Sequence, residues 1–149
     1  MVSYHYKFDK VLTVREQEKS ETELAYKESV MVFEKVATEL YDLLKKKEET
    51  MDAQNNQLTN GLSINHIHHY SNYIVGLQKR IDTLQKEVMQ ARSKMKWFEE
   101  KLLEKTLEVR KFEKIKEKDY KLFQQEQQRL ETIQLDEISS LKFQNKEIR

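Results

Sequence analysis

Three histidines lie close together near the middle of this sequence, in the run His66-Ile67-His68-His69. On a helix, residues three apart share a face, so His66 and His69 could both reach one metal ion. Only two ligands would converge there, and neither a cysteine nor a suitably spaced carboxylate completes a zinc site. We therefore interpret these histidines as solvated side chains at the start of a helix, and we predict no metal and no cofactor.

Lysine clusters at Lys45-Lys46-Lys47 and from Lys111 to Lys121 could contact phosphate groups. Glutamates alternate with these lysines at helical spacing, which favours a solvated face with ion pairs. The formal net charge of +1 also argues against nucleic acid as a partner, because nucleic-acid-binding domains are usually strongly basic.

The sequence contains no phosphate loop, nucleophile elbow, Cys-x-x-Cys or paired-carboxylate motif. We predict that the protein is not an enzyme. The absence of cysteine is typical of a reducing, cytoplasmic setting. No run approaches the 18 apolar residues of a membrane span, and the first residues lack the apolar core of a signal peptide.

The elements that position these side chains are two long helices. Apolar residues make up 38% of the chain and charged residues 36%, with no proline and two glycines, Gly61 and Gly76. The one strong break is residues 59–63, where Asn60-Gly61 can end a helix and Ser63 can cap the next. We predict a single all-α domain over residues 1–149, an antiparallel coiled-coil hairpin. Its first helix covers about 8–58 and its longer second helix about 64–135, followed by a frayed tail.

The second helix carries a clear heptad repeat. Its predicted seam positions are Ile67, Tyr70, Ile74, Leu77, Ile81, Leu84, Val88, Ala91, Met95, Phe98, Leu102, Lys105, Val109 and Phe112. The first helix is less regular, with predicted seam positions Leu12, Glu16, Lys19, Glu23, Tyr26, Val30, Phe33, Ala37, Leu40, Leu44, Lys47, Met51, Gln54 and Leu58. Beyond about Lys114 the second helix is expected to lack a partner within the chain.

Folding the chain about Asn60-Gly61 predicts that residues whose numbers sum to 121 face each other. Leu44 would then meet Leu77. Glu16 would meet Lys105, a register pair that joins two opposite charges within an apolar seam.

Two apolar clusters lie outside this seam. One is near the turn and contains Tyr41, Leu43, Tyr73 and Val75, beside Gly76. A glycine in an exposed helix costs about 1 kcal/mol, which suggests that another surface approaches closely there. The other cluster is Tyr4-x-Tyr6-x-Phe8 and the residues that follow it. We interpret both as candidate partner sites.

The order of these motifs resembles the FliJ family of flagellar export proteins. The opening run 6–15, Tyr-Lys-Phe-Asp-Lys-Val-Leu-Thr-Val-Arg, is similar to that family's aromatic pair, apolar pair and basic residue. The glycine turn, the run 70–77 and the charged run 108–118 follow in the family's order. The resemblance covers about residues 1–120.

The resemblance implies a non-enzymatic stalk of the flagellar type III export apparatus, similar to the coiled coil of a rotary ATPase gamma subunit. It implies insertion into the hexameric ring of the export ATPase FliI, contact with the export gate protein FlhA and escort of substrate chaperones. Residues implied to face the ATPase are Tyr6, Phe8, Leu12, Arg15, Lys111, Lys114 and Lys118. Tyr73 and Leu77 match gate-contact positions, and Leu43 is placed with them.

The protein is expected to be a monomer in isolation. The resemblance places it in the cytoplasm, peripherally associated with the export apparatus at the inner face of the cell membrane. Two alternatives stay open: a passive coiled-coil scaffold that spaces other proteins, and a general export chaperone.

Overall fold

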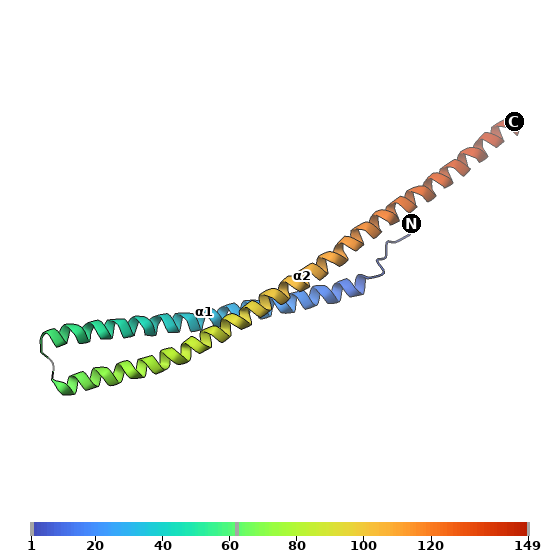
Figure 1. Cartoon of the computed structure of the whole chain (residues 1–149). Coiled ribbons are helices and arrows are strands. Elements are labelled where there is room, and N and C mark those ends of the chain that lie inside the picture. Colours follow the sequence, from blue (N-terminus) through green and yellow to red (C-terminus); the bar gives the residue numbers. More distant parts are fainter. Residues whose placement is uncertain (1, 62, 149) are drawn as a thin grey trace. The chain divides into compact units, whose positions relative to one another are not determined.

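A computed structural model describes residues 2–61 and 63–148. Helix α1 spans Asp9–Thr59 (51 residues) and helix α2 spans Ile64–Ile148 (85 residues) (Figure 1). The predicted all-α hairpin with a longer second helix is confirmed. Helix α2 continues to Ile148, however, so its predicted end near residue 135 is too early. The reason is that neither glycine nor proline, the two residues least favourable in a helix, follows Gly76.

The turn between the helices uses the residues that the sequence singled out. Gly61 has a φ of +84°, a conformation that glycine adopts without steric cost. The amide of Asn60 donates to the carbonyl of Gln57, and that of Gly61 donates to Leu58, which ends α1. The hydroxyl of Ser63 accepts from the amide of His66 at 3.5 Å and caps α2. The predicted turn also includes Leu62, which lies outside the described residues.

The chain divides into two compact units, and both helices contribute to each. Unit 1 contains Met1–Lys19 and Glu104–Arg149, and unit 2 contains Ser20–Leu103. In unit 2, two antiparallel helical segments are joined by the turn (Figure 1). In unit 1, the start of α1 and the segment before it lie against α2.

The seam predicted for α2 is confirmed along its whole length. Every predicted position from Ile67 to Phe112 is buried or half-buried. Burial is greatest in unit 2, where the side chains of Ile81 and Leu84 are each 1% exposed. Removing such a side chain from water contributes about 1.5–3 kcal/mol, so this stretch is the main core of the hairpin.

The seam predicted for α1 is half correct. One series is buried or half-buried as expected: Leu12, Lys19, Tyr26, Phe33, Leu40, Lys47 and Gln54. In the other series, Val30 and Ala37 are half-buried as predicted, next to Ser29 and Val36, which are buried or half-buried as well. Elsewhere in this series the seam is displaced by one residue toward the N-terminus, to Arg15, Thr22, Leu43 and Thr50. Leu44, Met51 and Leu58 are instead 42–44% exposed. The contact of Leu44 with Leu77 stays a prediction.

Ser29 explains how a polar residue can take a seam position. It is 5% exposed, and its hydroxyl donates to the carbonyl of Tyr26 at 2.6 Å. A serine that bonds back to its own helix buries no unsatisfied polar group. Small side chains at Ala25, Ser29 and Ala91 line a shallow cavity beside Phe98.

Candidate functional site

The segment before α1 is ordered against α2 and forms what we call the N-terminal strap, residues 2–8. It is not helical, so the predicted start of α1 at Phe8 is one residue early. Tyr6 is 3% exposed, and its hydroxyl donates to the carbonyl of Phe112 at 3.0 Å. The ring of Phe8 lies edge-on to Tyr6 and Phe112, with centroids 5.8 and 6.2 Å away. The strap is therefore part of the core of unit 1.

Tyr4 extends the strap further along α2. Its hydroxyl donates to Asp119 Oδ2 at 2.9 Å, and its ring meets Tyr120 and Phe123 edge-on at 5.0 and 5.2 Å. Burial, together with the hydrogen bond to Asp119, raises the pKa of Tyr4 to about 12. Helix α2 thus has an intrachain partner as far as Phe123, and the predicted limit near Lys114 is wrong. The heptad pattern does not indicate this contact, although aromatic residues at alternate positions are a signal of an extended segment.

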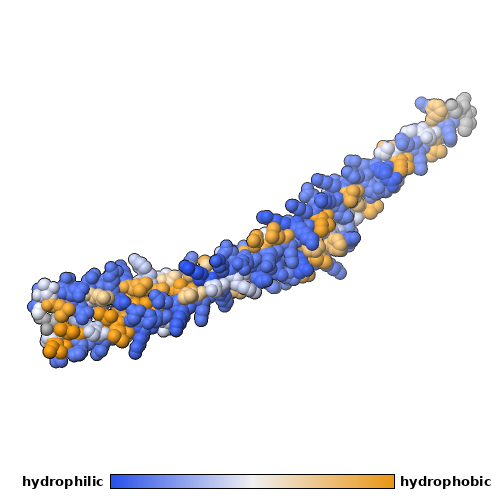
Figure 2. All heavy atoms as spheres, in the orientation of Figure 1, coloured by the Kyte–Doolittle hydropathy of each residue, from blue (hydrophilic) through white to orange (hydrophobic). Residues whose placement is uncertain are grey.

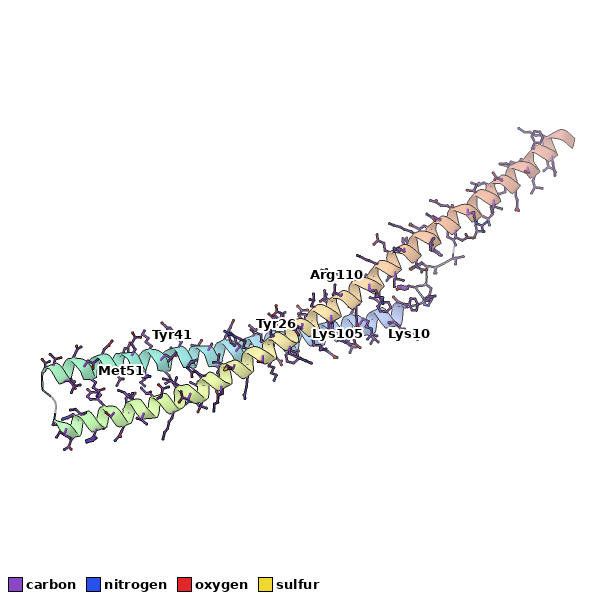
Figure 3. All side chains as sticks on the ribbon, in the orientation of Figure 1. Lys10, Tyr26, Tyr41, Met51, Lys105 and Arg110 are labelled. Atoms are coloured by element: carbon purple, nitrogen blue, oxygen red, sulfur yellow. The ribbon has the colours of Figure 1, made fainter. Side chains whose placement is uncertain are left out.

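Four charged side chains form a polar layer between α1 and α2 in unit 1. Lys105 Nζ donates to Glu18 Oε2 at 3.2 Å, and Arg15 Nη1 donates to the same oxygen at 3.1 Å. Arg15 Nε lies 3.6 Å from Glu108 Oε2 as an ion pair without a hydrogen bond. Figure 3 marks Lys105 on α2 in this stretch. We call Arg15, Glu18, Lys105 and Glu108 the charged layer.

The charged layer corrects the predicted register pair. Lys105 pairs with Glu18, whereas the predicted partner Glu16 is exposed. The cause is the displaced seam of α1, which turns Glu16 toward solvent and brings Arg15 and Glu18 toward α2. Hydrogen bonds from Lys105 and then Arg15 lower the pKa of Glu18.

The residues predicted to face an ATPase differ in accessibility. Tyr6 and Leu12 are buried at 3% and 5% exposure, and Phe8 and Arg15 are half-buried in contacts with α2. Lys111, Lys114 and Lys118 are exposed on α2. The structure therefore places Tyr6, Phe8 and Arg15 in contacts within the chain, buries Leu12 and leaves the three lysines on the surface.

The residues predicted to face an export gate lie in unit 2, near the turn. Tyr73 is 42% exposed, Leu43 is half-buried in the seam of α1, and Leu77 is 8% exposed. Tyr73 lines an open groove between the helices. The groove's other lining residues are Lys46, Glu49, Thr50, Ala53, His69 and Tyr70. Of the three predicted contacts, Tyr73 has the most accessible side chain.

Hydrophobic side chains are exposed around the turn, beside hydrophilic ones (Figure 2). They include Leu58, Ile64 and Val75, which are 44%, 72% and 54% exposed. A Cβ atom placed on Gly76 would meet nothing within 4 Å. No surface of unit 2 therefore requires a glycine at this position.

The histidines form no metal centre in the part of the chain that the structure describes. Residues 2–61 and 63–148 contain no group of three side chains suited to hold a metal ion. His66 Nδ1 instead lies 2.6 Å from Ser63 Oγ at the cap of α2.

Comparisons with known proteins identify the family of this chain. The family described as "Flagellar FliJ protein" matches residues 4–147. This chain belongs to the flagellar FliJ protein family. A relative named "Flagellar FliJ protein" from Bacillus subtilis (strain 168) is 36% identical over 142 residues, which cover 95% of this chain and 97% of the relative.

Membership of the FliJ family makes the protein a component of flagellar export. No solved structure gives a significant match to the chain. Among the described residues, neither α1 nor α2 contains a stretch long and apolar enough to cross a membrane.

Proposed function

We propose that this FliJ family member is a non-enzymatic stalk that inserts into the ring of the export ATPase FliI, promotes its assembly and hydrolysis, and couples it to the export gate protein FlhA. It acts as a monomer at the inner face of the cell membrane. Escort of substrate chaperones is a further part of this proposal.

The observation that carries the proposal is that each of the two units has an exposed surface of its own. Unit 1 presents a basic face on α2 beside the N-terminal strap, and unit 2 presents Tyr73 and other apolar side chains near the turn. Surfaces of different chemistry on one helical hairpin suit two different partners. A two-helix hairpin also offers little enclosed space in which a reacting group could be desolvated, which supports a role in binding.

Two single substitutions test this proposal with the purified export ATPase. We expect the wild-type protein to raise ATP hydrolysis and ring oligomerisation. Phe8→Ala should weaken this stimulation, because Phe8 holds the strap on Phe112. Tyr73→Ala should preserve the stimulation and reduce flagellar export in cells. Helix content and thermal unfolding of both variants, followed by circular dichroism, control for loss of the fold.

Two outcomes would contradict the proposal. If the wild-type protein leaves both hydrolysis and oligomerisation unchanged, the ATPase role is wrong. If Tyr73→Ala removes stimulation while Phe8→Ala reduces export alone, the two surfaces are assigned to the wrong partners.

The last turns of α2 favour a second candidate, a passive coiled-coil scaffold. Their large apolar side chains are 41–63% exposed: Leu130, Ile133, Leu135, Ile138, Leu141 and Phe143. Such a face could pair with another chain. Sedimentation equilibrium separates the two roles, since the stalk is proposed to be a monomer. Capture of export substrates in the absence of the ATPase would instead support a general export chaperone.

A further inference from the structure

The end of α2 carries an apolar face that no part of the described chain covers. The strap follows α2 as far as Phe123, whose ring meets Tyr4 at 5.2 Å. Beyond this point four large apolar side chains are 41–61% exposed, and Figure 2 shows hydrophobic side chains on the surface of this segment. They are Leu130, Ile133, Ile138 and Leu141, and we call them the terminal face.

The four residues of the terminal face lie on one side of the helix. Ile133, Ile138 and Leu141 follow Leu130 by three, eight and eleven residues, and these spacings return to the same side of an α-helix. An open hollow beside Ile133 and Leu141 is lined by α2 alone and includes the small side chain of Ser140. An apolar side chain of another molecule can pack there.

The spacing of the terminal face is the same in both directions along the helix. Its members are separated by three, five and three residues, so the pattern is symmetric about residues 135–136. A second copy that lies antiparallel presents the same pattern, with its Leu141 opposite Leu130 and its Ile138 opposite Ile133. A surface that is complementary to itself in this way is what a two-fold symmetric dimer requires.

Two charged residues beside the terminal face favour the same arrangement. Glu131 and Lys142 are exposed, and because they are eleven residues apart they lie on the same side of the helix. In the antiparallel pair, Glu131 of each copy lies beside Lys142 of the other, which gives two ion pairs related by symmetry. A parallel pair in register would instead bring the two Glu131 side chains to the same level of the interface.

The net charge of the segment changes sign close to the same centre. Residues 126–137 contain four acidic residues and one basic residue, a net charge of −3, and residues 138–149 contain three basic residues and one acidic residue, a net charge of +2. Antiparallel pairing places the acidic half of each copy against the basic half of the other, whereas parallel pairing would place like charges together. Both the apolar pattern and the charges therefore favour a second copy of this chain as the partner.

We infer that the free protein forms a reversible antiparallel homodimer through residues 130–142 of α2. The paired segment is about 20 Å long at 1.5 Å per residue. An interface of this length falls below the roughly 1,200 Å² of stable complexes, so the dimer forms at high concentration and dissociates on dilution. The inference goes beyond the proposed function, in which the dissociated monomer acts at the ATPase.

Charge reversal in the full-length chain tests the pairing, with sedimentation equilibrium at about 1 µM to 1 mM protein. We expect the dimer fraction of wild type to rise over this range. Glu131→Lys and Lys142→Glu should each weaken dimerisation by about fivefold or more, because each replaces both ion pairs by like charges. Glu48→Lys, the same change at an exposed residue of unit 2, should dimerise like wild type.

Mixing the two variants separates a direct charge contact from a loss of fold. The first variant has lysine at both positions and the second has glutamate at both, so a dimer of one copy of each regains two ion pairs. We expect an equimolar mixture to dimerise like wild type. A mixture that dimerises no better than the separate variants would overturn the inference.

Disulfide formation tests the orientation of the two copies. The sequence contains no cysteine, so Leu130→Cys and Leu141→Cys each introduce a single thiol. When the two variants are mixed and oxidised, we expect disulfides to join unlike copies faster than like copies. Faster joining of like copies would overturn the antiparallel arrangement.

Two results for the wild-type chain would also overturn the inference. One is a monomer up to about 1 mM; protection of residues 130–142 from hydrogen exchange by the export ATPase would then assign the terminal face to that protein. The other is a dimer that persists on dilution, which would support the passive scaffold. Hydrolysis and export enter none of the dimerisation measurements, so the proposed function is tested separately.

Discussion

At the scale of single residues, the polar layer between the helices is the most specific feature of unit 1. Apolar contacts tolerate small shifts along a seam, whereas an ion pair between Glu18 and Lys105 is satisfied at one register. Arg15 adds a second cation to the same carboxylate. We therefore interpret the charged layer as a determinant of helix register.

The lowered pKa of Glu18 makes this contribution dependent on pH. A carboxyl group whose folded pKa lies below its unfolded value of about 4.3 stabilises the fold above that value and loses the effect as pH falls through the folded pKa. We expect Glu18→Gln to lower the free energy of unfolding at pH 7 and to have progressively less effect below about pH 4. Urea unfolding at several pH values measures this difference. The exposed neighbour Glu16, changed to Gln, is the control, and an equal loss in both variants would contradict the prediction.

At the scale of elements, the buried face of α2 could be predicted from the sequence more accurately than that of α1. In α2 every predicted seam position from Ile67 to Phe112 except Lys105 is apolar, so the heptad pattern was sufficient. In α1 several apolar residues, such as Leu44 and Met51, lie one position outside the seam, while Ser29 lies within it. At Leu44 and Met51, a choice based on hydrophobicity therefore favours the wrong residue. The hydrogen bond of Ser29 to its own helix, which permits its burial, cannot be read from a heptad pattern.

The strap was less predictable than either helix. Its three aromatic residues were recognised as an apolar cluster, but their partners lie more than 100 positions later in the sequence. The pairing of Tyr4 with Asp119 depends on where the turn brings the two segments together. Local patterns carry no information about such a contact. The burial of Leu12 was expected from its seam position, whereas the burial of Tyr6 against α2 was not.

We predict that replacing each of the two glycines by alanine changes the free energy of unfolding in opposite directions. Gly61→Ala should destabilise the fold by about 1 kcal/mol, because an alanine is strained at a φ of +84°. Gly76→Ala should stabilise it by about 0.8–1 kcal/mol, because position 76 lies within α2 and has free space around it. Chemical unfolding followed by circular dichroism measures both changes. A destabilised Gly76→Ala variant would show that the glycine has a structural role in the isolated protein.

At the scale of the whole molecule, the last turns of α2 contribute little to the stability of the fold. The large apolar side chains from Leu130 to Phe143 are all more than two-fifths exposed. The ion pair between Glu126 and Arg129 is local to α2, since these residues are three apart. This part of the helix is thus available for a function other than holding the hairpin together.

Two truncations test whether the end of α2 contributes less to stability than the strap. Removal of residues 130–149 should leave the thermal unfolding midpoint unchanged and reduce helix content in proportion to the residues removed. Removal of residues 2–8 should lower the midpoint, because it uncovers the core around Tyr6 and Phe112. A lower midpoint in the first variant would mean that the end of α2 packs in solution, and sedimentation would then show whether it packs in a dimer.

The strap also bears on the order in which the contacts of the hairpin form. Gln57 and Tyr70, which bond beside the turn, are 13 residues apart, whereas Tyr4 and Asp119 are 115 apart. Closing a longer loop costs more entropy, so pairing is favoured to begin at the turn and to proceed toward the chain ends. During synthesis the strap leaves the ribosome more than 100 residues before its partners on α2. The nascent chain therefore carries the aromatic residues Tyr4, Tyr6 and Phe8 uncovered until that part of α2 has been synthesised.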